Sequence, residues 1–556
     1  MGLDRSTLGL RWSTHGGDVG IASARPGLVV RVGGKAHTWQ PEAVEVAGEA
    51  LRASGGPGGC RLDLVACSTA DDAVTLDLTV TNEGPEAVHI ERVEVLRSSA
   101  IHVGGHASAW RCYRNGYQSW SGTHTLGADE ADRDFRWRFA RVGSTDARHR
   151  APHEPGRIRS DALSAICDAH AASALGLGFG TLADAFCFIE IDAAAQHPQL
   201  ICWADFDGTT LAPGDSTAKV TLHLVAEHGD REAGWRALQR VARNCGDAMA
   251  ARGRNQRHPA GWCSWYYYFE KVTEQDVVEN LEVLAADGLR GPKFGCEYVM
   301  VDDGHQAEIG DWLDTHPAKF PSGMADLARR IGSAGFDSGI WWAPFFAAPR
   351  SKVALAHPDW LVRGPSGRPI TGLINPAWGI TKPMRVLDTT HPEVLAHLTA
   401  TARHIGVQWG YRIQKLDFLY AAALPGIRHD RGATRAQSLR RGLEAIRRGA
   451  GEDAFLLGCG CPLGPAIGVV DAMRIGADVT PYWTNWLARH VLLDTHGLAT
   501  RHAVMNTLTR AVVDGAWWLN DPDCLMLRDS ETRLNEEEVR LMATVFGMTN
   551  GMIVLS

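Results

Sequence analysis

The sequence has no excess of basic residues and no run of them. It contains 56 Lys and Arg against 64 Asp and Glu, which gives a formal net charge of -8 and a pI of about 6.3. Proteins that bind nucleic acids usually carry a basic surplus or a basic patch. The composition therefore argues against that class, and we expect no nucleic-acid partner.

Long hydrophobic runs are also missing. No apolar stretch approaches the roughly 18 residues that a membrane-spanning helix needs. The first residues, "MGLDRSTLGLRW", hold no apolar run of signal-peptide length. We therefore expect a cytoplasmic protein without a membrane partner.

The cysteines lack the regular paired spacing of a disulfide framework. All 12 are scattered along the chain, a pattern that indicates free thiols in a reducing compartment. Cys459 and Cys461 form a Cys-x-Cys pair, but no second Cys or His pair follows at a spacing suited to zinc. We expect neither a metal nor an organic cofactor.

Tyrosine is scarce, with nine Tyr against 19 Trp. Indole rings stack on the apolar faces of sugar rings, but they also fill protein cores. Composition alone favours the core as the place of most of these tryptophans. Only their position in the fold can indicate a binding role.

The chain up to about residue 230 is typical of β-structure. Short segments with alternating apolar and polar residues are separated by turn clusters such as "SGGPGG" and "APGDS". Many short strands in succession predict a large sandwich of two sheets. The segment "DREAGWRALQRVARNCGDAMA" then has helical spacing. We expect an N-terminal sandwich domain with its linker helix over residues 1–250 and a second domain over 251–556.

The second domain alternates strands with helices. Its eight strand candidates are 260–267, 296–303, 338–345, 412–418, 453–460, 471–476, 515–520 and 551–556. This rhythm over about 300 residues predicts a (β/α)8 barrel. An open doubly wound sheet would need a glycine-rich turn after its first strand, and "GWCSWYYYF" is no such turn.

Polar side chains stand where these predicted strands end, which is the edge that holds the active site of such a barrel. They are Asp302, Asp303, Lys415, Asp417, Cys459, Arg474, Asp478, Asp521 and Asp523, and Trp341 and Trp342 join them. We expect them to converge on one rim. The bland alternatives are a turn at "DDG", a capped turn at "NDPD" and a structural ion pair of Arg474.

The segment "QKLDFLY" raises a specific question, because a buried strand seldom carries charges. Alternation points residues 413, 415 and 417 into the barrel and residues 414, 416 and 418 toward the helices. We expect Lys415 and Asp417 to pair with each other in a polar mouth, where the lysine keeps the pKa of the aspartate low. Lys415 is alternatively the Schiff-base lysine of an aldolase.

Two carboxylates beside aromatic side chains suggest glycoside hydrolysis, in which one carboxylate attacks the sugar and the other protonates the leaving oxygen. Six motifs then resemble glycoside hydrolase family 36, the bacterial α-galactosidases or melibiases, which share a clan with family 27. They are "GWCSWYYYF", "VDDGHQAEIGDWL", "GIWWAPF", "QKLDFLYAAALPG", "LLGCGCPLGPAIGVVDAMRIGADVTPYW" and "WLNDPDCLML". The resemblance covers residues 258–556 in order. The N-terminal domain resembles the family's β-supersandwich more loosely.

The resemblance implies roles for individual residues. Asp417 corresponds to the nucleophile and Asp478 to the general acid/base, although Ala477 stands where the family commonly has Pro. Asp302 and Asp303 correspond to the pair that binds the hydroxyls at C4 and C6. The other implied sugar contacts are Trp265, Tyr266, Trp341, Lys415, Cys459 and Arg474. Tyr117, in the loop "GYQSWSG", is expected to reach over the site where a relative has Trp.

The function that follows from the resemblance is a retaining exo-α-galactosidase with a small galactoside as its substrate. An α-N-acetylgalactosaminidase, a galactosyl-transferring relative and a non-catalytic carbohydrate-binding homologue are the alternatives. Family members usually continue past the eighth strand into a small C-terminal β-domain. This sequence ends at "MIVLS", so we expect that domain to be missing.

Overall fold

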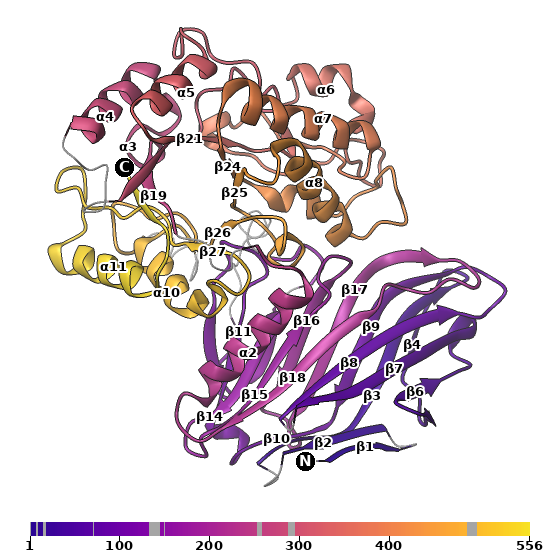
Figure 1. The fold of residues 1–556 in the computed structure, drawn as a ribbon. Helices are drawn as coiled ribbons and strands as arrows, with labels where there is room; N and C mark the ends of the chain where they lie inside the picture. The colour runs from indigo at the N-terminus through magenta and orange to yellow at the C-terminus, as the bar shows by residue number, and fades with distance from the viewer. Residues whose placement is uncertain are drawn as a thin grey trace.

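The computed structural model describes residues 2–6, 9–14, 18–70, 72–132, 145–149, 151–252, 258–286, 295–485 and 497–556. Two halves lie against each other, as Figure 1 shows, with a β-rich N-terminal half and a barrel formed by the later residues. The predicted class, a (β/α)8 barrel after a large β-sandwich, is confirmed. The boundary at residues 250 and 251 stays a prediction.

Two antiparallel sheets form the N-terminal half. The first contains β1 (Gly2–Ser6), β2 (Gly9–Ser13), β3 (Val19–Val32), β4 (Lys35–Trp39), β9 (Val88–Ser98), β10 (Ala100–Val103), β13 (Arg157–Asp161), β16 (Phe186–Asp192) and β17 (Gln199–Leu211). The second contains β5 (Glu45–Ala47), β6 (Ala50–Ala53), β7 (Cys60–Ala70), β8 (Ala73–Asn82), β11 (Trp110–Arg114), β12 (His124–Gly127), β14 (Leu163–Asp168), β15 (Ser173–Phe179) and β18 (Val220–His228). Alternating burial along β8 shows the apolar face that the pattern predicts.

The helix after β18 connects the two halves. Helix α2 (Ala233–Ala248) packs on β14, β15 and β18 through buried small and apolar residues. It also contacts the barrel, because the indole nitrogen of Trp517 donates to the carbonyl oxygen of Ala242 at 3.0 Å. The predicted linker helix is therefore present, and it serves as part of the junction.

Eight parallel strands form the barrel sheet. They are β19 (Ala260–Cys263), β20 (Cys296–Val301), β21 (Asp337–Trp342), β24 (Ile413–Leu416), β25 (Phe455–Gly458), β26 (Ala472–Arg474), β27 (Leu519–Asp521) and β28 (Ile553–Leu555). Every one overlaps a predicted strand. The sheet closes because Cys524 bridges Val554, with the amide nitrogen of Leu525 donating to the carbonyl oxygen of Val554 at 2.7 Å.

Helices and a strand pair surround this sheet (Figure 1). The α-helices are α3 (Trp265–Tyr268), α4 (Glu274–Ala286), α5 (Met324–Ser333), α6 (Lys352–Ala356), α7 (Pro392–Arg403), α8 (Arg435–Ala450), α10 (Thr500–Arg510) and α11 (Glu536–Met548). The short pair β22 (Phe346–Ala347) and β23 (Arg385–Val386) belongs to a long excursion between β21 and α7. That excursion carries Trp378 to the rim of the barrel.

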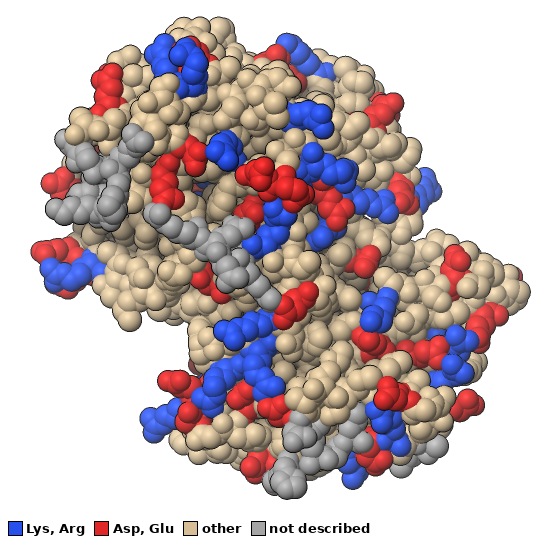
Figure 2. Space-filling model, viewed as in Figure 1, with Lys and Arg blue, Asp and Glu red and all other residues tan. Residues whose placement is uncertain are grey.

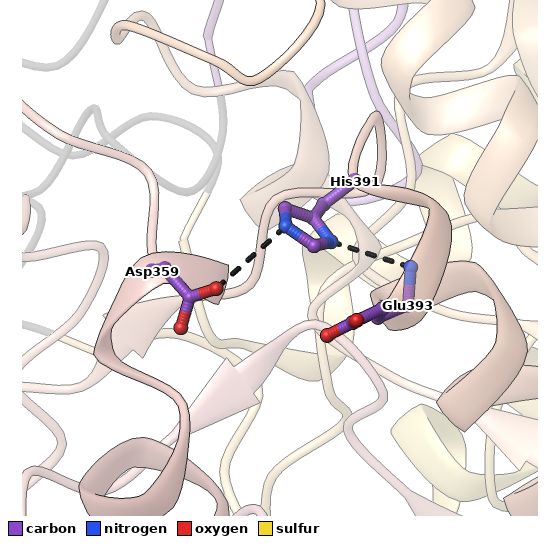
Figure 3. A group of neighbouring side chains, drawn as sticks. All are labelled: Asp359, His391 and Glu393. Atoms are coloured by element: carbon purple, nitrogen blue, oxygen red, sulfur yellow. Dashed lines mark hydrogen bonds and ion pairs between the residues drawn. The ribbon is translucent and has the colours of Figure 1, made fainter.

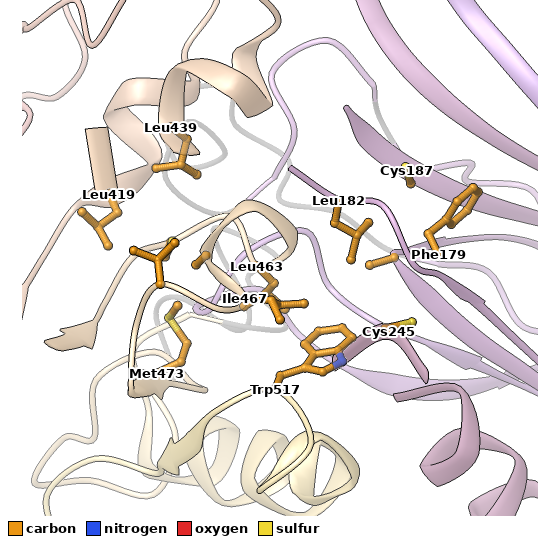
Figure 4. Packing of buried hydrophobic residues seen from close by; sticks show 14 of the residues in the cluster. Phe179, Leu182, Cys187, Cys245, Leu419, Leu439, Leu463, Ile467, Met473 and Trp517 are labelled. Carbon is orange, nitrogen blue, oxygen red and sulfur yellow. The ribbon is translucent and has the colours of Figure 1, made fainter. Parts of the chain in front are cut away.

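The hydrophobic core continues from one half into the other. Figure 4 shows Leu182 and Cys245 of the N-terminal half close to Leu463, Ile467 and Trp517 of the barrel, and all of them belong to one buried cluster. No polar layer separates the halves at this place. The sandwich is therefore packed against the barrel as part of the same folded body.

A buried ion cluster joins the halves at a second place. Arg435, the first residue of α8, pairs with Asp146, Asp205 and Asp207 of the sandwich at 2.9, 2.9 and 2.6 Å. No helix in the described part of the chain combines the length and the apolar character that crossing a bilayer requires.

Candidate active site at the carboxyl rim of the barrel

Asp417 lies just past the end of β24. One carboxylate oxygen accepts a hydrogen bond from the indole nitrogen of Trp341 at 3.0 Å, and the other accepts from the amide of Phe418 at 2.7 Å. Both donors are N–H groups, and no cation is recorded in an ion pair with this carboxylate among the described residues. The carboxylate is therefore oriented by neutral donors, which leave its charge available to a ligand.

The backbone turns sharply at the next residue. Phe418 has a φ of +52°, in the left-handed region that a bulky side chain seldom adopts. The turn directs its ring to the rim, where it meets the rings of Trp120 and Trp378 at centroid distances of 5.4 and 5.1 Å. The prediction that residue 418 faces the helices is therefore wrong, because the strand has already ended at Leu416. Gln414 does face α7, where its amide nitrogen donates to the carbonyl of Ala402 at 3.1 Å.

Lys415 does not pair with Asp417. Its ammonium group lies 2.8 Å from a carboxylate oxygen of Asp302, on β20's extension, and both side chains are buried. Burial alone lowers the pKa of Lys415, but Asp302 together with the thiols of Cys263 and Cys459 outweighs it and raises that pKa well above its ordinary value. The expected Lys415–Asp417 pair is corrected to Lys415–Asp302, because residue 417 lies beyond the strand and no longer follows its alternation.

Asp303 points to a different set of donors. Its carboxylate accepts from the indole nitrogen of Trp378 at 2.7 Å and from the amide of Gln306 at 2.6 Å. Burial raises the pKa of Asp303 to about 6, and the charges of Asp302 and Asp417 act in the same direction. The turn that we considered as the alternative at "DDG" is present, but it also places the carboxylates of Asp302 and Asp303 at the rim.

Arg474, at the end of β26, holds a cluster of acids. Its guanidinium lies 3.0 Å from Asp478, 3.2 Å from Asp521 and 2.8 Å from Asp523. The side chains of Asp521 and Asp523 are buried, whereas 35% of the Asp478 side chain is exposed. Asp478 is therefore the member of this cluster that a ligand can reach.

Opposing effects act on Asp478. Desolvation raises the pKa of its carboxyl, the cations Arg474 and Lys415 lower it, and the negative charge of Asp417 raises it again. The net result is a raised pKa. Since the interaction of two charges weakens with their separation, the influence of Asp417 indicates that both carboxyls belong to one site.

The aromatic residues predicted on the first barrel strand differ in their surroundings. Tyr266 is buried, and its hydroxyl donates a short hydrogen bond to Asp523 and accepts one from Arg474 at 3.3 Å. Trp265 is half-buried and packs edge-to-face on Phe269, with ring centroids 5.3 Å apart. Cys459 is fully buried, and the charges of Asp417, Lys415, Asp478 and Arg474 act on its thiol, which places it at the same site.

Tyr117 does not join this group. Its ring packs edge-to-face on Phe186, with centroids 5.1 Å apart, inside a separate apolar cluster at the junction that also contains Ala423 and Ala436 of the barrel. Trp120 of the same loop reaches the rim instead and contacts Phe418. A tight turn, in which the amide of Ser121 donates to the carbonyl of Gln118 at 3.0 Å, swings residue 120 toward the barrel.

The loop that carries Trp120 is bonded to the barrel. The amide of Ser119 donates to the carbonyl of Cys461 at 2.9 Å, and the amide of Cys461 donates to the hydroxyl of Ser119 at 3.1 Å. Gly460 makes room for the indole: a Cβ at this position would lie 2.8 Å from two ring carbons of Trp120. The N-terminal half thus contributes a side chain to the rim.

Trp120, Trp378 and Phe418 lie at the rim but were not among the predicted site residues, and Asp523 was expected at the rim without a role in binding. Asp523 stands in "NDPD", which was noted at a strand end but not chosen, and its contact with Arg474 shows its place. Trp120 shares its loop with the residue chosen by resemblance. Trp378 lies in a loop without periodicity, so no local signal indicates it.

Among the described residues, one group of side chains could hold a metal ion, and it lies away from this rim. It consists of Asp359, His391 and Glu393 (Figure 3). Nδ1 of His391 accepts the amide hydrogen of Glu393 at 3.2 Å and so caps helix α7. This bond places the ring proton on Nε2, the nitrogen that faces Asp359 at 3.8 Å. The group is explained by the helix cap.

The surface of the barrel half carries charges of both signs. Figure 2, drawn from the same side as Figure 1, shows acidic and basic side chains next to each other in the middle of that half. A parallel barrel with paired acids and indoles at its carboxyl rim resembles the glycoside hydrolase class.

Comparison with known proteins indicates a particular family within that class. Residues 254–416 match the model of the Melibiase family. An α-galactosidase of Escherichia coli is 32% identical over 90 residues, which are 15% of this chain and 13% of that protein. The aligned segment thus spans a small part of that relative's length.

Solved structures align over much more of the chain. The α-galactosidase TtGalA of Thermus thermophilus, in complex with p-nitrophenyl α-D-galactopyranoside, superposes with a TM-score of 0.66 at 28% identity and covers 91% of this chain and 90% of its own. The family 36 α-galactosidase AgaA of Geobacillus stearothermophilus shares the fold, with a TM-score of 0.62 at 14% identity over 98% of this chain and 72% of its own. The resemblance to glycoside hydrolase family 36 is confirmed.

Proposed function

We propose that the chain is a glycosidase that removes terminal α-D-galactosyl residues from small galactosides with retention of the anomeric configuration. The observation that carries the proposal is the pair of unlike carboxylates at one rim. Asp417 is held by N–H donors alone, and Asp478 has a raised pKa beside it. The alignment with TtGalA, whose structures contain p-nitrophenyl α-D-galactopyranoside and stachyose, supports the choice of sugar.

The two carboxylates suit the two steps of a double displacement. In the first step Asp417 attacks the anomeric carbon, and the bond to the leaving oxygen breaks as Asp478 gives that oxygen a proton. A β-galactosyl ester of Asp417 forms. In the second step Asp478 takes a proton from water, the water oxygen attacks the same carbon, and the ester bond breaks to return Asp417 and release α-galactose.

The local bonds favour this division of roles. Hydrogen bonds from N–H groups stabilise the ionised form of a carboxylate, as a nucleophile requires. Asp417 receives two such bonds, from Trp341 and Phe418. Desolvation of Asp478 favours its protonated form, as a general acid requires.

The opposite side of the rim offers groups for the sugar hydroxyls. Asp302 and Asp303 present carboxylates there, and Lys415 and Trp378 hold them by hydrogen bonds and charge. We infer that the two aspartates accept hydrogen bonds from the hydroxyls at C4 and C6, which would select an axial O4. Trp120 and Phe418 would form the apolar wall.

A Schiff-base mechanism at Lys415 does not suit these contacts. A Schiff-base lysine must lose its proton before it attacks a carbonyl group. Lys415 is held 2.8 Å from Asp302, and the pKa of Lys415 is raised well above its ordinary value. Glycoside hydrolysis therefore remains the better interpretation of this rim.

Replacement of the nucleophile tests the proposal. Asp417→Ala should lower kcat/KM on p-nitrophenyl α-D-galactopyranoside by at least about 10³-fold, because the first step loses its attacking group. Asp388→Asn, which changes a buried carboxylate bonded to Thr390 and His429, is the matched control and should keep near-normal kcat/KM. Normal hydrolysis by a folded Asp417→Ala variant would overturn the assignment.

The stereochemistry and the acid/base role need separate measurements. Proton NMR of the first product should show the α-anomer, and the β-anomer would exclude retention. Azide should rescue Asp478→Ala on an activated galactoside, because azide needs no general base. A matched N-acetylgalactosaminide and a search for transfer products distinguish the two enzymatic alternatives. Binding of galactose without any turnover would support the non-catalytic alternative.

A further inference from the structure

Arg474 and Asp478 pose an electrostatic problem. A carboxyl group in contact with a guanidinium ordinarily has a lowered pKa and gives up its proton early. A general acid needs the opposite, namely a proton kept near neutral pH. Asp478 lies 3.0 Å from Arg474, yet its pKa is raised. Desolvation is the largest cause of this rise, and any group that offsets the charge of Arg474 helps to preserve it.

Arg474 has two other partners that are more deeply buried than Asp478. Nε lies 3.2 Å from Asp521, and one terminal nitrogen lies 2.8 Å from Asp523. Each of these carboxylates is almost completely shielded from solvent, while the guanidinium itself is 3% exposed. Charges interact strongly in such surroundings, so the two buried carboxylates, when ionised, offset part of the positive charge that Asp478 would otherwise meet.

Asp523 also forms a hydrogen bond with the backbone next to Asp478. Its other carboxylate oxygen accepts the amide hydrogen of Val479, the residue after Asp478, at 2.8 Å. The first oxygen accepts the Tyr266 hydroxyl hydrogen in addition to the guanidinium. Three donors thus converge on Asp523. This arrangement is suited to an ionised carboxylate.

The backbone at Asp523 is adapted to this task. Its φ is +94°, a conformation that costs free energy for a residue with a Cβ atom. Asp521 holds this conformation, because one of its oxygens accepts the amide hydrogen of Asp523 at 2.9 Å. A strained residue at this position indicates that the placement of the carboxylate is over-determined by its neighbours.

We propose that Asp523 is a positioning residue, which with Asp521 offsets the charge of Arg474 and fixes the backbone at Asp478 so that Asp478 keeps its proton. The proposal rests on the proposed function, since it takes Asp478 as the acid/base of a glycosidase. Asp523 contacts the acid's segment and the arginine, and it is not expected to touch the sugar.

The other charged groups around Asp478 come from several elements of the barrel. Those described are Asp302 after β20, Lys415 and Asp417 at β24, Arg474 on β26, Tyr266 in α3, and Asp521 and Asp523 at the end of β27. Burial raises the pKa of Asp523 to about 7, so its charge is present above that pH. The influence of Asp523 is therefore greatest on the alkaline side of the pH profile.

Asp523→Asn tests the proposal, because it keeps the shape and removes the charge. Without the charge of Asp523, the positive charge of Arg474 is compensated less. It then favours the ionised form of Asp478 more strongly, so the pKa of Asp478 falls. The alkaline limb of the kcat/KM profile, which reports the general acid of the free enzyme, should move to lower pH by about one unit. The acidic limb should stay in place. Asp388→Asn is the matched control and should leave both limbs in place.

An alkaline limb that stays in place in a folded Asp523→Asn variant would overturn the proposal, even if kcat falls at every pH. If that variant does not fold, Tyr266→Phe replaces it. This change removes one donor from Asp523, raises the pKa of Asp523 and should shift the alkaline limb in the same direction by a smaller amount. An unchanged limb in Tyr266→Phe would also overturn the proposal.

Infrared titration separates this proposal from the proposed function. The carboxyl band of Asp478 is obtained as the difference between the wild-type protein and Asp478→Asn, and the same subtraction is made in the Asp523→Asn background. A lower pKa of Asp478 in that background supports the charge offset, whether or not galactosides are hydrolysed. An unchanged pKa of Asp478 contradicts it, even in an active enzyme.

Discussion

Two buried arginines of this chain have the same immediate surroundings and different consequences. Arg435 at the junction of the two halves and Arg474 at the barrel rim are each 3% exposed, and each contacts three carboxylates. The carboxylates of the first cluster belong to the sandwich, and those of the second follow barrel strands. Each arginine therefore contacts the same number of carboxylates. The two clusters differ in the charged groups that lie beyond these direct contacts.

At the junction, further nitrogen groups contact the same carboxylates. Arg148 lies 2.7 Å from Asp207 and 3.2 Å from Asp205, and Nε2 of His149 lies 2.8 Å from Asp205. Burial alone would raise the pKa of Asp207, but Arg435 and the hydrogen bonds outweigh it and lower that pKa to about 2. The carboxylate of Asp207 is thus held in its charged form, as a structural ion cluster requires.

At the rim, the additional charges are mainly anions. Asp417 and Asp302 act on Asp478 and raise its pKa together with desolvation. Burial raises the pKa of Asp523 as well, to about 7. The comparison teaches that three acids around one arginine do not by themselves indicate a role. The charged groups that surround each cluster decide whether its carboxylates stay ionised or can exchange a proton.

Arg435→Met should have the largest effect on folding. It leaves three buried carboxylates short of their main partner, which typically costs about 3–5 kcal/mol of unfolding free energy. Urea or thermal denaturation measures this loss. The protein that remains folded should keep its kcat, because Arg435 lies at the junction. A loss of kcat with unchanged stability would remove the distinction between the two clusters.

Arg474→Met should lower activity far more than Arg435→Met does. The substitution frees Asp478, Asp521 and Asp523 from their shared partner and leaves their charges buried together. We expect kcat/KM on an activated galactoside to fall by at least about 10²-fold, the equivalent of roughly 3 kcal/mol. The measurement is made beside Arg435→Met at equal folded fraction. Similar activity in the two variants would contradict the proposal that the Arg474 cluster serves catalysis and the Arg435 cluster serves only the fold.

Trp378→Phe sharpens the comparison within the rim. The indole nitrogen of Trp378 stabilises the charged form of Asp303, so its loss should raise the pKa of Asp303 further above about 6. A hydrogen bond to a charged group is worth about 1.5–3 kcal/mol, so we expect KM to rise roughly tenfold or more. Trp409→Phe, on the outer side near α7, is the matched control. An unchanged KM and acidic limb would show that Trp378 only packs.

Asp207→Asn should change the pH dependence of stability. The pKa of Asp207 is lowered in the folded state, so its charge stabilises the fold above the unfolded pKa of about 4 and ceases to do so as the pH falls toward 2. The difference in unfolding free energy between wild type and variant should therefore shrink over that window. Denaturation at several pH values measures it, and a constant difference would argue against a lowered pKa.

His391→Ala is expected to have the smallest effect. The ring caps α7, and loss of such a cap costs about 1 kcal/mol. Because we attribute the group of Asp359, His391 and Glu393 to this cap, neither the variant nor treatment with a chelator should alter kcat. A chelator-dependent loss of activity in the wild-type protein that His391→Ala abolishes would show that the group binds a metal.

Much of the fold was predictable because it depends on periodicity. Alternation in the first half and the strand–helix rhythm of the second identify the sandwich and all eight barrel strands. The least accurate segment was 515–520, where the strand itself is Leu519–Asp521. Two adjacent tryptophans gave this segment the composition of a strand, although Trp517 and Trp518 precede it and pack in the junction core.

The site was predictable only to the ends of the strands. Asp302, Asp303, Arg474 and Asp478 stand at or just past such ends, and the structure brings them to one rim. The partner of Lys415 was not predictable, because strand alternation stops at Leu416 and cannot place Asp417. Trp378 was missed for a related reason. It is carried by an irregular excursion whose path depends on tertiary packing against Trp341 and Phe418.

The loop with Trp120 has a consequence for how this architecture can change over evolutionary time. Gln118 and Pro462 form a bridge between the halves, flanked by the reciprocal bonds of Ser119 and Cys461. A gene fusion that replaced the sandwich with an unrelated module would remove these bonds and the Trp120 side chain at the rim at once. The two halves are thus expected to be inherited together. Exchange of one half should succeed only between relatives that share the same contacts between the halves.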